Sequence, residues 1–190
     1  VDILRWGMDV GYPVKVSSNG GRYHYQDDWE TPDTQVITMD FKEGFTMTWE
    51  GRSCNGHYVE GSSVGAIFYG DQGTLHITQG NGYHIYDLKG EKIKSVEDKE
   101  KIDPRNTASP AQQLDALHIY NFYDAIMNGT RLRSDLESSH MSTVLLQLGN
   151  IAQRVGRSLD VDPGTGHVLK DPEAMKLWSR EYEPGWEMKV

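Results

Sequence analysis

The chain has 190 residues, of which 37% are hydrophobic and 25% charged, a composition typical of one globular domain with its own buried core. Its formal net charge is −9 at pH 7, and its lysines and arginines are scattered, so we expect no nucleic-acid partner. Its apolar runs are far shorter than the roughly 20 residues that cross a bilayer, so we expect no membrane partner either.

The beginning of the chain has helical spacing. Ile3, Leu4 and Met8 recur at near-helical intervals, and Gly11 and Pro13 then end the pattern. This start has neither an initiating methionine nor a basic and apolar leader, which is typical of the interior of an element. We therefore expect the last turns of a helix here and a natural amino terminus that lies upstream.

A two-residue period replaces the helical one between Val14 and Val96. In residues 35–41 the apolar side chains alternate with polar ones, residues 45–50 repeat the pattern, and the glycine-containing segment 42–44 joins the two as a hairpin loop. Further short runs are predicted as strands at 14–16, 64–69, 74–78, 83–88 and, more weakly, 92–96. These runs predict a meander of about six or seven mostly antiparallel strands.

Helices follow the strands. A proline- and serine-containing connection at 95–109 leads to an amphipathic helix over 109–128, with Ser109 as its cap. A second amphipathic helix at 134–156 begins with a capping box, and a short third one spans about 172–182. The predicted fold is therefore α+β, an open, mostly antiparallel sheet with helices packed on one face.

The segment Arg22–Asp33 combines one arginine, four carboxylates and three aromatic side chains between two predicted strands. Aromatic platforms beside carboxylates are what a sugar pocket requires, and carboxylates paired across a cleft could also hydrolyse a glycosidic bond. A structural explanation is equally open, because Asp27 and Asp28 favour turns and Asp33 could satisfy backbone groups beside Pro32.

One histidine is a further candidate for ligand binding. His140 lies in the first turns of the helix at 134–156, where the positive end of the helix dipole favours anionic or hydroxylic ligands, although a solvated or core histidine is the simpler alternative. The seven histidines and single cysteine have no metal-binding spacing, so we predict no metal site. No glycine-rich nucleotide motif follows a predicted strand and opens a helix.

Five segments, in order, resemble the carboxy-terminal domain of the Gfo/Idh/MocA oxidoreductases. The tail Pro184-Gly185-Trp186 narrows the resemblance to a bacterial branch of that family. The resemblance covers nearly the whole chain and rests on residues 1–6, 27–34, 70–75, 118–126 and 149–157.

The resemblance implies that residues 1–190 are one carboxy-terminal domain of a larger protein, without its amino-terminal Rossmann domain. That domain would bind NAD or NADP and hold the catalytic lysine, and the catalytic histidine would belong to an H-x-x-D element whose aspartate is Asp2. We therefore expect no principal catalytic residue and no cofactor site in this chain. Whether the chain is itself an enzyme stays open, and alone it should be inactive.

The implied role is the substrate-binding and oligomerisation half of an NAD(P)-dependent dehydrogenase acting on a sugar, polyol or derivative. Arg22, Tyr23, Asp28, Trp29 and His140 are the predicted substrate-binding residues. Partners would be the chain's own Rossmann domain, the substrate and further copies joined through the β-sheet. The alternative is a stand-alone carbohydrate-binding or structural oligomerisation module. Cysteine content leaves the compartment undetermined, with the cytoplasm slightly favoured over the periplasm.

Overall fold

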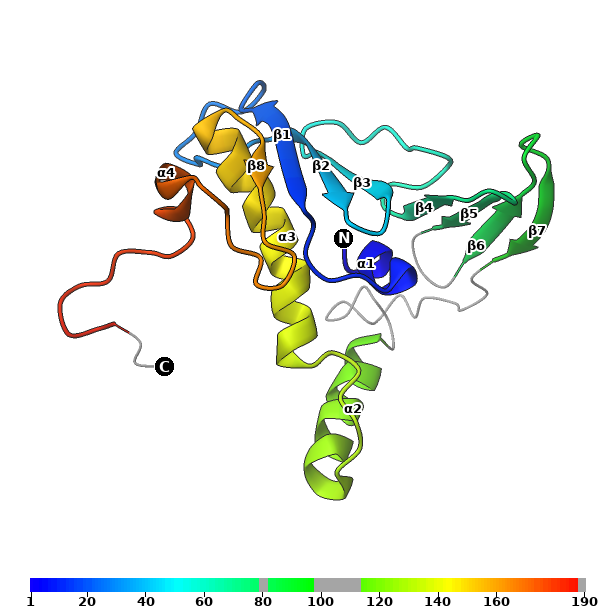
Figure 1. The fold of residues 1–190 in the computed structure, drawn as a ribbon. Helices are drawn as coiled ribbons and strands as arrows, with labels where there is room; N and C mark the ends of the chain where they lie inside the picture. The colour runs from blue at the N-terminus through cyan, green and yellow to red at the C-terminus, as the bar shows by residue number, and fades with distance from the viewer. Residues whose placement is uncertain (79–81, 98–113, 188–190) are drawn as a thin grey trace. The chain divides into compact units, whose positions relative to one another are not determined.

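The computed structural model describes residues 1–78, 82–97 and 114–187. The chain forms two compact units: unit 1 comprises Val1–Gly56 and Glu137–Val190, and unit 2 comprises His57–Leu136 (Figure 1). Within the described residues each unit contains one antiparallel sheet of four strands. The α+β class is thus confirmed, and the strands are divided between two sheets because each unit pairs its own strands.

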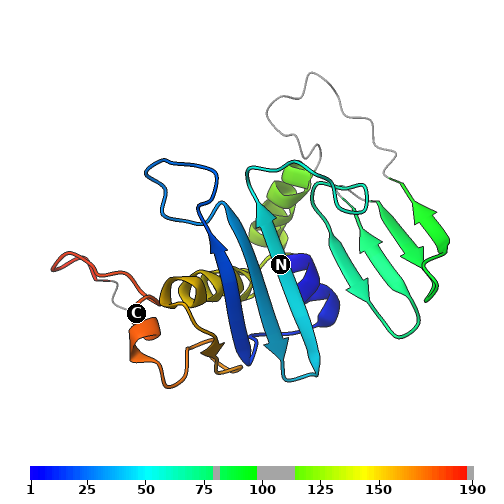
Figure 2. The same ribbon diagram turned by 90° about the horizontal axis from the view of Figure 1, so that it is seen from above.

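The sheet of unit 1 has the order β3-β2-β1-β8. Its strands are β1 (Lys15–Gly21), β2 (Thr34–Phe41), β3 (Phe45–Arg52) and β8 (Leu159–Asp160) (Figure 2). The predicted hairpin between β2 and β3 is confirmed, and Gly44 has the positive φ of 88° that its tight turn needs. The sequence pattern does not predict β8, because two residues are too few to show an alternation of apolar and polar side chains. In the sheet, β8 pairs with the start of β1.

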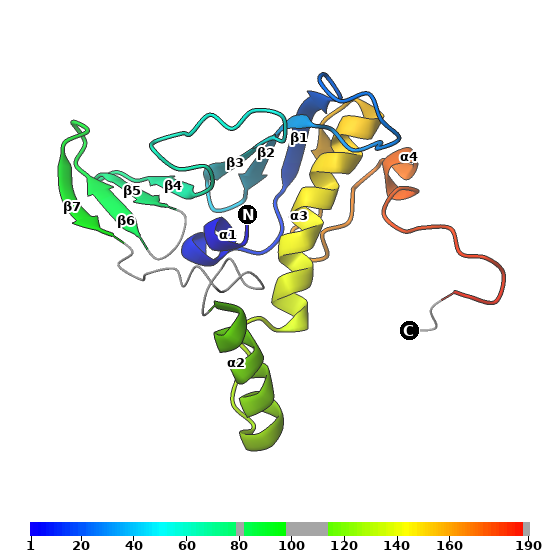
Figure 3. The same ribbon diagram turned by 180° about the vertical axis from the view of Figure 1, so that it is seen from behind.

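Helix α3 (Leu136–Val155) lies across this sheet (Figure 3). Its predicted apolar face is confirmed, because Val144, Leu145 and Leu148 are buried against strand residues such as Ile37 and Met39. Gly149 lets the helix come close, since a Cβ there would overlap the Ile37 side chain.

Two shorter helices complete unit 1. The predicted first helix is confirmed as α1 (Asp2–Met8), which ends at Asp9 in a left-handed conformation. The predicted last helix is shorter than expected: α4 spans only Pro172–Met175, with the Asp171 carboxylate accepting from the Ala174 N–H. Among the described residues, no helix has both the length and the hydrophobicity needed to cross a membrane.

The described part of unit 2 contains a four-stranded meander and one helix. The strands are β4 (Ala66–Tyr69), β5 (Thr74–Ile77), β6 (Tyr83–Tyr86) and β7 (Lys92–Val96), and the helix is α2 (Leu114–Asn128). The predicted cap at Ser109 and most of the 95–109 connection lie outside the described residues. The expectation that this helix covers a sheet face is wrong for the described part of α2, whose large apolar side chains are exposed: Leu117, Ile119, Tyr120, Phe122, Tyr123, Ile126 and Met127.

Candidate functional site

The loop between β1 and β2 is organised by one buried carboxylate. Oδ2 of Asp33 accepts hydrogen bonds from the backbone N–H groups of Tyr23 (3.0 Å), His24 (2.9 Å) and Tyr25 (3.1 Å). Oδ1 accepts from the Thr34 hydroxyl at 2.9 Å. These bonds, led by the one from His24, hold the pKa of Asp33 far below its ordinary range despite the opposing effect of burial. The structural explanation for Asp33 is therefore confirmed.

Arg22 closes the same loop. Its guanidinium pairs with the Asp27 carboxylate and donates to the Thr31 carbonyl at 2.9 Å, and Cζ lies 6.0 Å from the centre of the Tyr25 ring. Asp27 also accepts from the Trp29 N–H at 3.1 Å, which is the turn that its sequence favours. Arg22 and Asp27 thus fix the loop, and this leaves Arg22 little freedom to bind a ligand.

The remaining predicted residues of the loop face outward. Tyr23 is 74% exposed, Trp29 is 70% exposed, and Asp28 is exposed between them in the sequence. The loop is tied to the end of α3, where Arg154 pairs with Glu30 at 3.1 Å. Tyr23, Asp28 and Trp29 are thus exposed on a backbone that the hydrogen bonds to Asp33 hold in place.

His140 lies apart from these four residues. It is exposed in the second turn of α3, whereas the loop contacts the last turn, at Arg154. With a rise of 1.5 Å per residue, the two positions are about 20 Å apart along the helix. The structure therefore brings together Arg22, Tyr23, Asp28 and Trp29 but not His140.

An arginine network joins α1 to α3, and the sequence patterns did not reveal it. Arg5 donates from Nε to the Ser142 hydroxyl (2.9 Å) and from Nη2 to the Ser138 carbonyl (3.2 Å). The Ser142 hydroxyl in turn donates to Asp2 Oδ1 at 2.5 Å. The only sequence signal was the three-residue spacing of Asp2 and Arg5, which says nothing of a partner 133 or more positions away. The Asp2 side chain, from α1, is thus held against α3.

The residues present do not fit a dinucleotide. Gly164 and Gly166 belong to a turn in which both backbone N–H groups donate to Asp162, and the short helix α4 that follows is capped by the Asp171 carboxylate, which would repel a phosphate. Among the described strands, β8 is followed by these glycines and then by α4, but Val168 pairs back with Val161 after the turn, so the glycines do not open the helix. The described residues contain no group of three or more His, Cys, Asp or Glu side chains that could hold a metal ion.

A family model matches most of the chain. The profile described as "Oxidoreductase family, C-terminal alpha/beta domain", of the Gfo/Idh/MocA type, matches residues 8–161. The chain belongs to this family. The predicted resemblance is thus confirmed, and the matched residues include the organised loop and the strands of both sheets. No curated protein sequence matches the chain.

Solved structures share the fold at low sequence identity. An oxidoreductase from Agrobacterium radiobacter, in complex with NAD+, L-tartaric acid and magnesium, has a TM-score of 0.65 and 15% identity over 84% of this chain. The WlbA dehydrogenase from Bordetella pertussis, in complex with NADH and UDP-GlcNAcA, has a TM-score of 0.50 and 12% identity over 85% of this chain. The chain spans less than half of each relative, 46% and 42% respectively.

Proposed function

We propose that residues 1–190 form the substrate-side and oligomerisation domain of a larger NAD(P)-dependent oxidoreductase acting on a sugar, polyol or derivative. Family membership supports the reaction class. The coverage of less than half of each oxidoreductase relative supports a partner domain that supplies the rest. Those two relatives were solved with NAD+ or NADH and with a hydroxylated ligand or a nucleotide sugar, which supports the proposed cofactor and substrate class.

The observation that carries the proposal is the pair of exposed rings on the Asp33-organised loop. Exposed aromatic rings are costly in water, but they stack well on the C–H face of a sugar, while an adjacent carboxylate accepts hydrogen bonds from its hydroxyl groups. Tyr23 and Trp29 would supply the rings and Asp28 the carboxylate. Arg22 would contribute by holding the loop.

The chemistry divides between two domains. Bound NAD(P) would accept a hydride from the carbinol carbon, while a base on the other domain removes the hydroxyl proton. This chain would hold the substrate at near-attack distance and exclude water. His140, far from the loop, would contact the substrate only if the pocket extends along α3.

Oligomerisation would use the sheet face that α3 leaves uncovered. Thr46 and Thr48 are exposed on that face, and Thr46 donates to Asp40 at 2.7 Å. Such a face could stack on the same face of a second copy related by twofold symmetry. Sedimentation of the chain as a monomer at high micromolar concentration would count against this part of the proposal.

The decisive experiment compares Trp29→Ala with Trp186→Ala in the protein encoded by the full reading frame. Trp186 is similarly exposed, at 79%, but lies outside the loop, so it is a matched control. Loss of the Trp29 ring should raise KM for the sugar or polyol about tenfold, since ring stacking is worth about 1 kcal/mol or slightly more, and should change kcat less. The control should leave both constants unchanged.

Two outcomes would overturn the proposal. One is a reading frame that lacks a strand, a glycine-rich turn and a helix upstream of Val1. The other is micromolar binding of NAD(H) by the 190-residue chain in calorimetry, since this chain should show none. Sugar binding by a chain with no upstream nucleotide domain would favour a stand-alone carbohydrate-binding module instead.

A further inference from the structure

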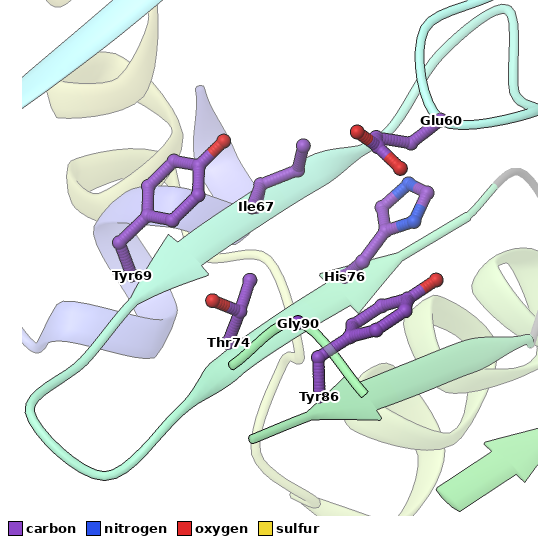
Figure 4. A pocket seen from close by; sticks show the side chains of 7 residues that line it. All are labelled: Glu60, Ile67, Tyr69, Thr74, His76, Tyr86 and Gly90. Atoms are coloured by element: carbon purple, nitrogen blue, oxygen red, sulfur yellow. The ribbon is translucent and has the colours of Figure 1, made fainter. Parts of the chain in front are cut away.

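Unit 2 contains a cavity of about 230 Å³ on one face of its sheet (Figure 4). Its walls include Glu60, Ile67, Tyr69, Thr74, His76 and Tyr86. The strand register explains why these side chains meet: Ile67 is opposite His76, and Thr74 is opposite both Tyr69 and Tyr86. Residues directly opposite in antiparallel strands point to the same face, so β4, β5 and β6 together build the floor.

His76 is the polar centre of this cavity. It is 3% exposed, and within the described part of the chain its Nδ1 is buried without a hydrogen-bond partner. Burial lowers the pKa of His76, and nearby His84 and Lys92 lower it further, against the opposing effect of Glu60. A neutral imidazole with an unpaired buried nitrogen is costly in a folded protein and calls for a partner.

Glu60 stands over His76 on a strained turn. Val59 and Ser62 exchange two backbone hydrogen bonds of 3.0 Å, and the two residues between them, Glu60 and Gly61, have positive φ values of 51° and 78°. Such turns favour Asn-Gly, and a long side chain in the left-handed region costs free energy. Figure 4 shows the Glu60 carboxylate beside the His76 ring. Strain of this kind concentrates where a side chain is needed for binding.

The charges around the cavity select the ligand. Glu60 is the one formally charged residue of the described lining, and it would repel an anion. Lys92 is opposite Tyr86 in the strand register and lies beside that wall, with Nζ 5.6 Å from the centre of the Tyr86 ring, so it would oppose a cation. The other polar groups are hydroxyls and an imidazole, which can both donate and accept. An uncharged molecule with several hydroxyl groups satisfies this set.

We propose that this cavity is a binding site for a small uncharged polyol or monosaccharide. Glu60 would accept hydrogen bonds from its hydroxyls, the Tyr69 and Tyr86 rings would pack on its C–H face, and His76 would gain the missing partner. Because Nδ1 itself is buried, a side chain of the wall must rotate when the ligand enters. The volume is below the roughly 300–1,000 Å³ of pockets for drug-sized ligands, which fits a small ligand. The site shares no residue with the loop of unit 1 and goes beyond the proposed function.

The test is a titration of the 190-residue chain with glycerol, erythritol, xylitol, glucose and myo-inositol, followed by NMR of the histidine Cε1–H signals. At least one probe should shift the His76 signal saturably. Glu60→Gln removes the charge at nearly constant shape, and should weaken that binding about tenfold or more, as expected for a hydrogen bond to a charged group. His84→Gln, beside the cavity but outside its wall, and Trp29→Ala, in the other unit, should bind as the parent chain does.

A second variant separates binding from folding. Glu60→Asn creates the favoured turn sequence, so it should raise the thermal stability of unit 2 while it weakens binding of the probe. A stability gain with unchanged binding would overturn the proposal, and so would the absence of any saturable shift up to about 100 mM of every probe, which means binding no tighter than about −1.4 kcal/mol. Tighter binding of choline than of every polyol would overturn the ligand class. Trp29→Ala tests the loop separately, so failure at either site is distinguishable.

Discussion

The two units differ in whether the apolar face of their helix is buried. In unit 1, α3 packs its apolar face on the sheet, and nearly all of the buried hydrophobic residues of the described chain lie there. In unit 2, Ala66 is the one buried hydrophobic residue among those described, and the apolar side chains of α2 are exposed. Both helices have the spacing typical of an amphipathic helix, so the spacing alone does not say whether a surface is present to receive it.

The candidate sites of the two units also differ in kind. The loop of unit 1 is rigid because buried Asp33 ties down three backbone N–H groups, and its aromatic rings are free to meet a ligand. The cavity of unit 2 contains the unpaired His76 Nδ1 beside a glutamate with a positive φ, whereas the unpaired atom of the loop, Arg22 Nε, belongs to a guanidinium whose other nitrogens bond Asp27 and Thr31. Hydrogen bonds made within the fold, such as those of Asp33, stabilise a scaffold, whereas an imidazole that has an unpaired nitrogen and lines a cavity is a candidate for ligand binding.

Removal of a buried side chain should produce the largest difference between the units. Leu148→Ala in α3 should lower the free energy of unfolding by about 2–5 kcal/mol, because Leu148 is fully buried and leaves a cavity. Leu117→Ala in α2 should change it by no more than about 0.5 kcal/mol, because Leu117 is 45% exposed.

Urea unfolding measures both effects. Far-UV circular dichroism follows the whole chain, and tryptophan fluorescence follows unit 1, since all five tryptophans lie there. Equal losses from the two variants would mean that α2 packs against a surface in solution, and the contrast between the units would disappear.

A larger side chain in the contact between α3 and the sheet should have the next largest effect on stability. Gly149→Ala should lower the free energy of unfolding by about 1–2 kcal/mol, because the new Cβ would overlap Ile37 in a closely packed core. The loss should occur although alanine is the better helix former by about 1 kcal/mol. Gly56→Ala is the control, because open space surrounds that position. A more stable Gly149→Ala variant would show that α3 can move away from β2.

The acid dependence of stability should reveal Asp33. Its folded-state pKa lies below its ordinary value of 3.8, so its contribution is fully present above about pH 5 and is lost progressively as the pH falls from there through the folded-state pKa. Asp33→Asn should therefore flatten the fall in unfolding free energy between about pH 5 and pH 2. Asp28→Asn, at an exposed carboxylate of the same loop, should leave the slope unchanged. Equal slopes for the parent and Asp33→Asn would remove Asp33 as the organiser of the loop.

The smallest effect should come from an exposed ion-pair cluster of unit 1. Arg157 binds both carboxylate oxygens of Asp171 at 2.8 Å and also Glu173 at 2.7 Å, which raises the pKa of Arg157 and lowers that of Asp171. Arg157→Lys loses the two-pronged geometry and should lower Tm slightly in dilute buffer. The change should vanish in about 1 M salt, where screening removes exposed ion pairs. A Tm loss that persists in salt would mean that Arg157 acts through packing.

Local chemistry determines much of this protein. Alternation fixed the strands and buried faces of β2 and β3, and helical spacing fixed α1 and the buried face of α3, because period and side-chain direction are properties of the local backbone. The loop at Arg22–Asp33 was also recognisable, since its composition is unusual and its aspartates favour turns.

Tertiary structure decided what depends on partners distant in the sequence. It assigned the strands to two sheets, paired two-residue β8 with β1, left α2 exposed and joined Arg5 to Ser138 and Ser142. It also separated His140 from the loop and brought His76 under Glu60, from a turn and a strand with no shared motif. Spacing along a chain encodes neighbours within one element, whereas these contacts arise only when separate elements pack.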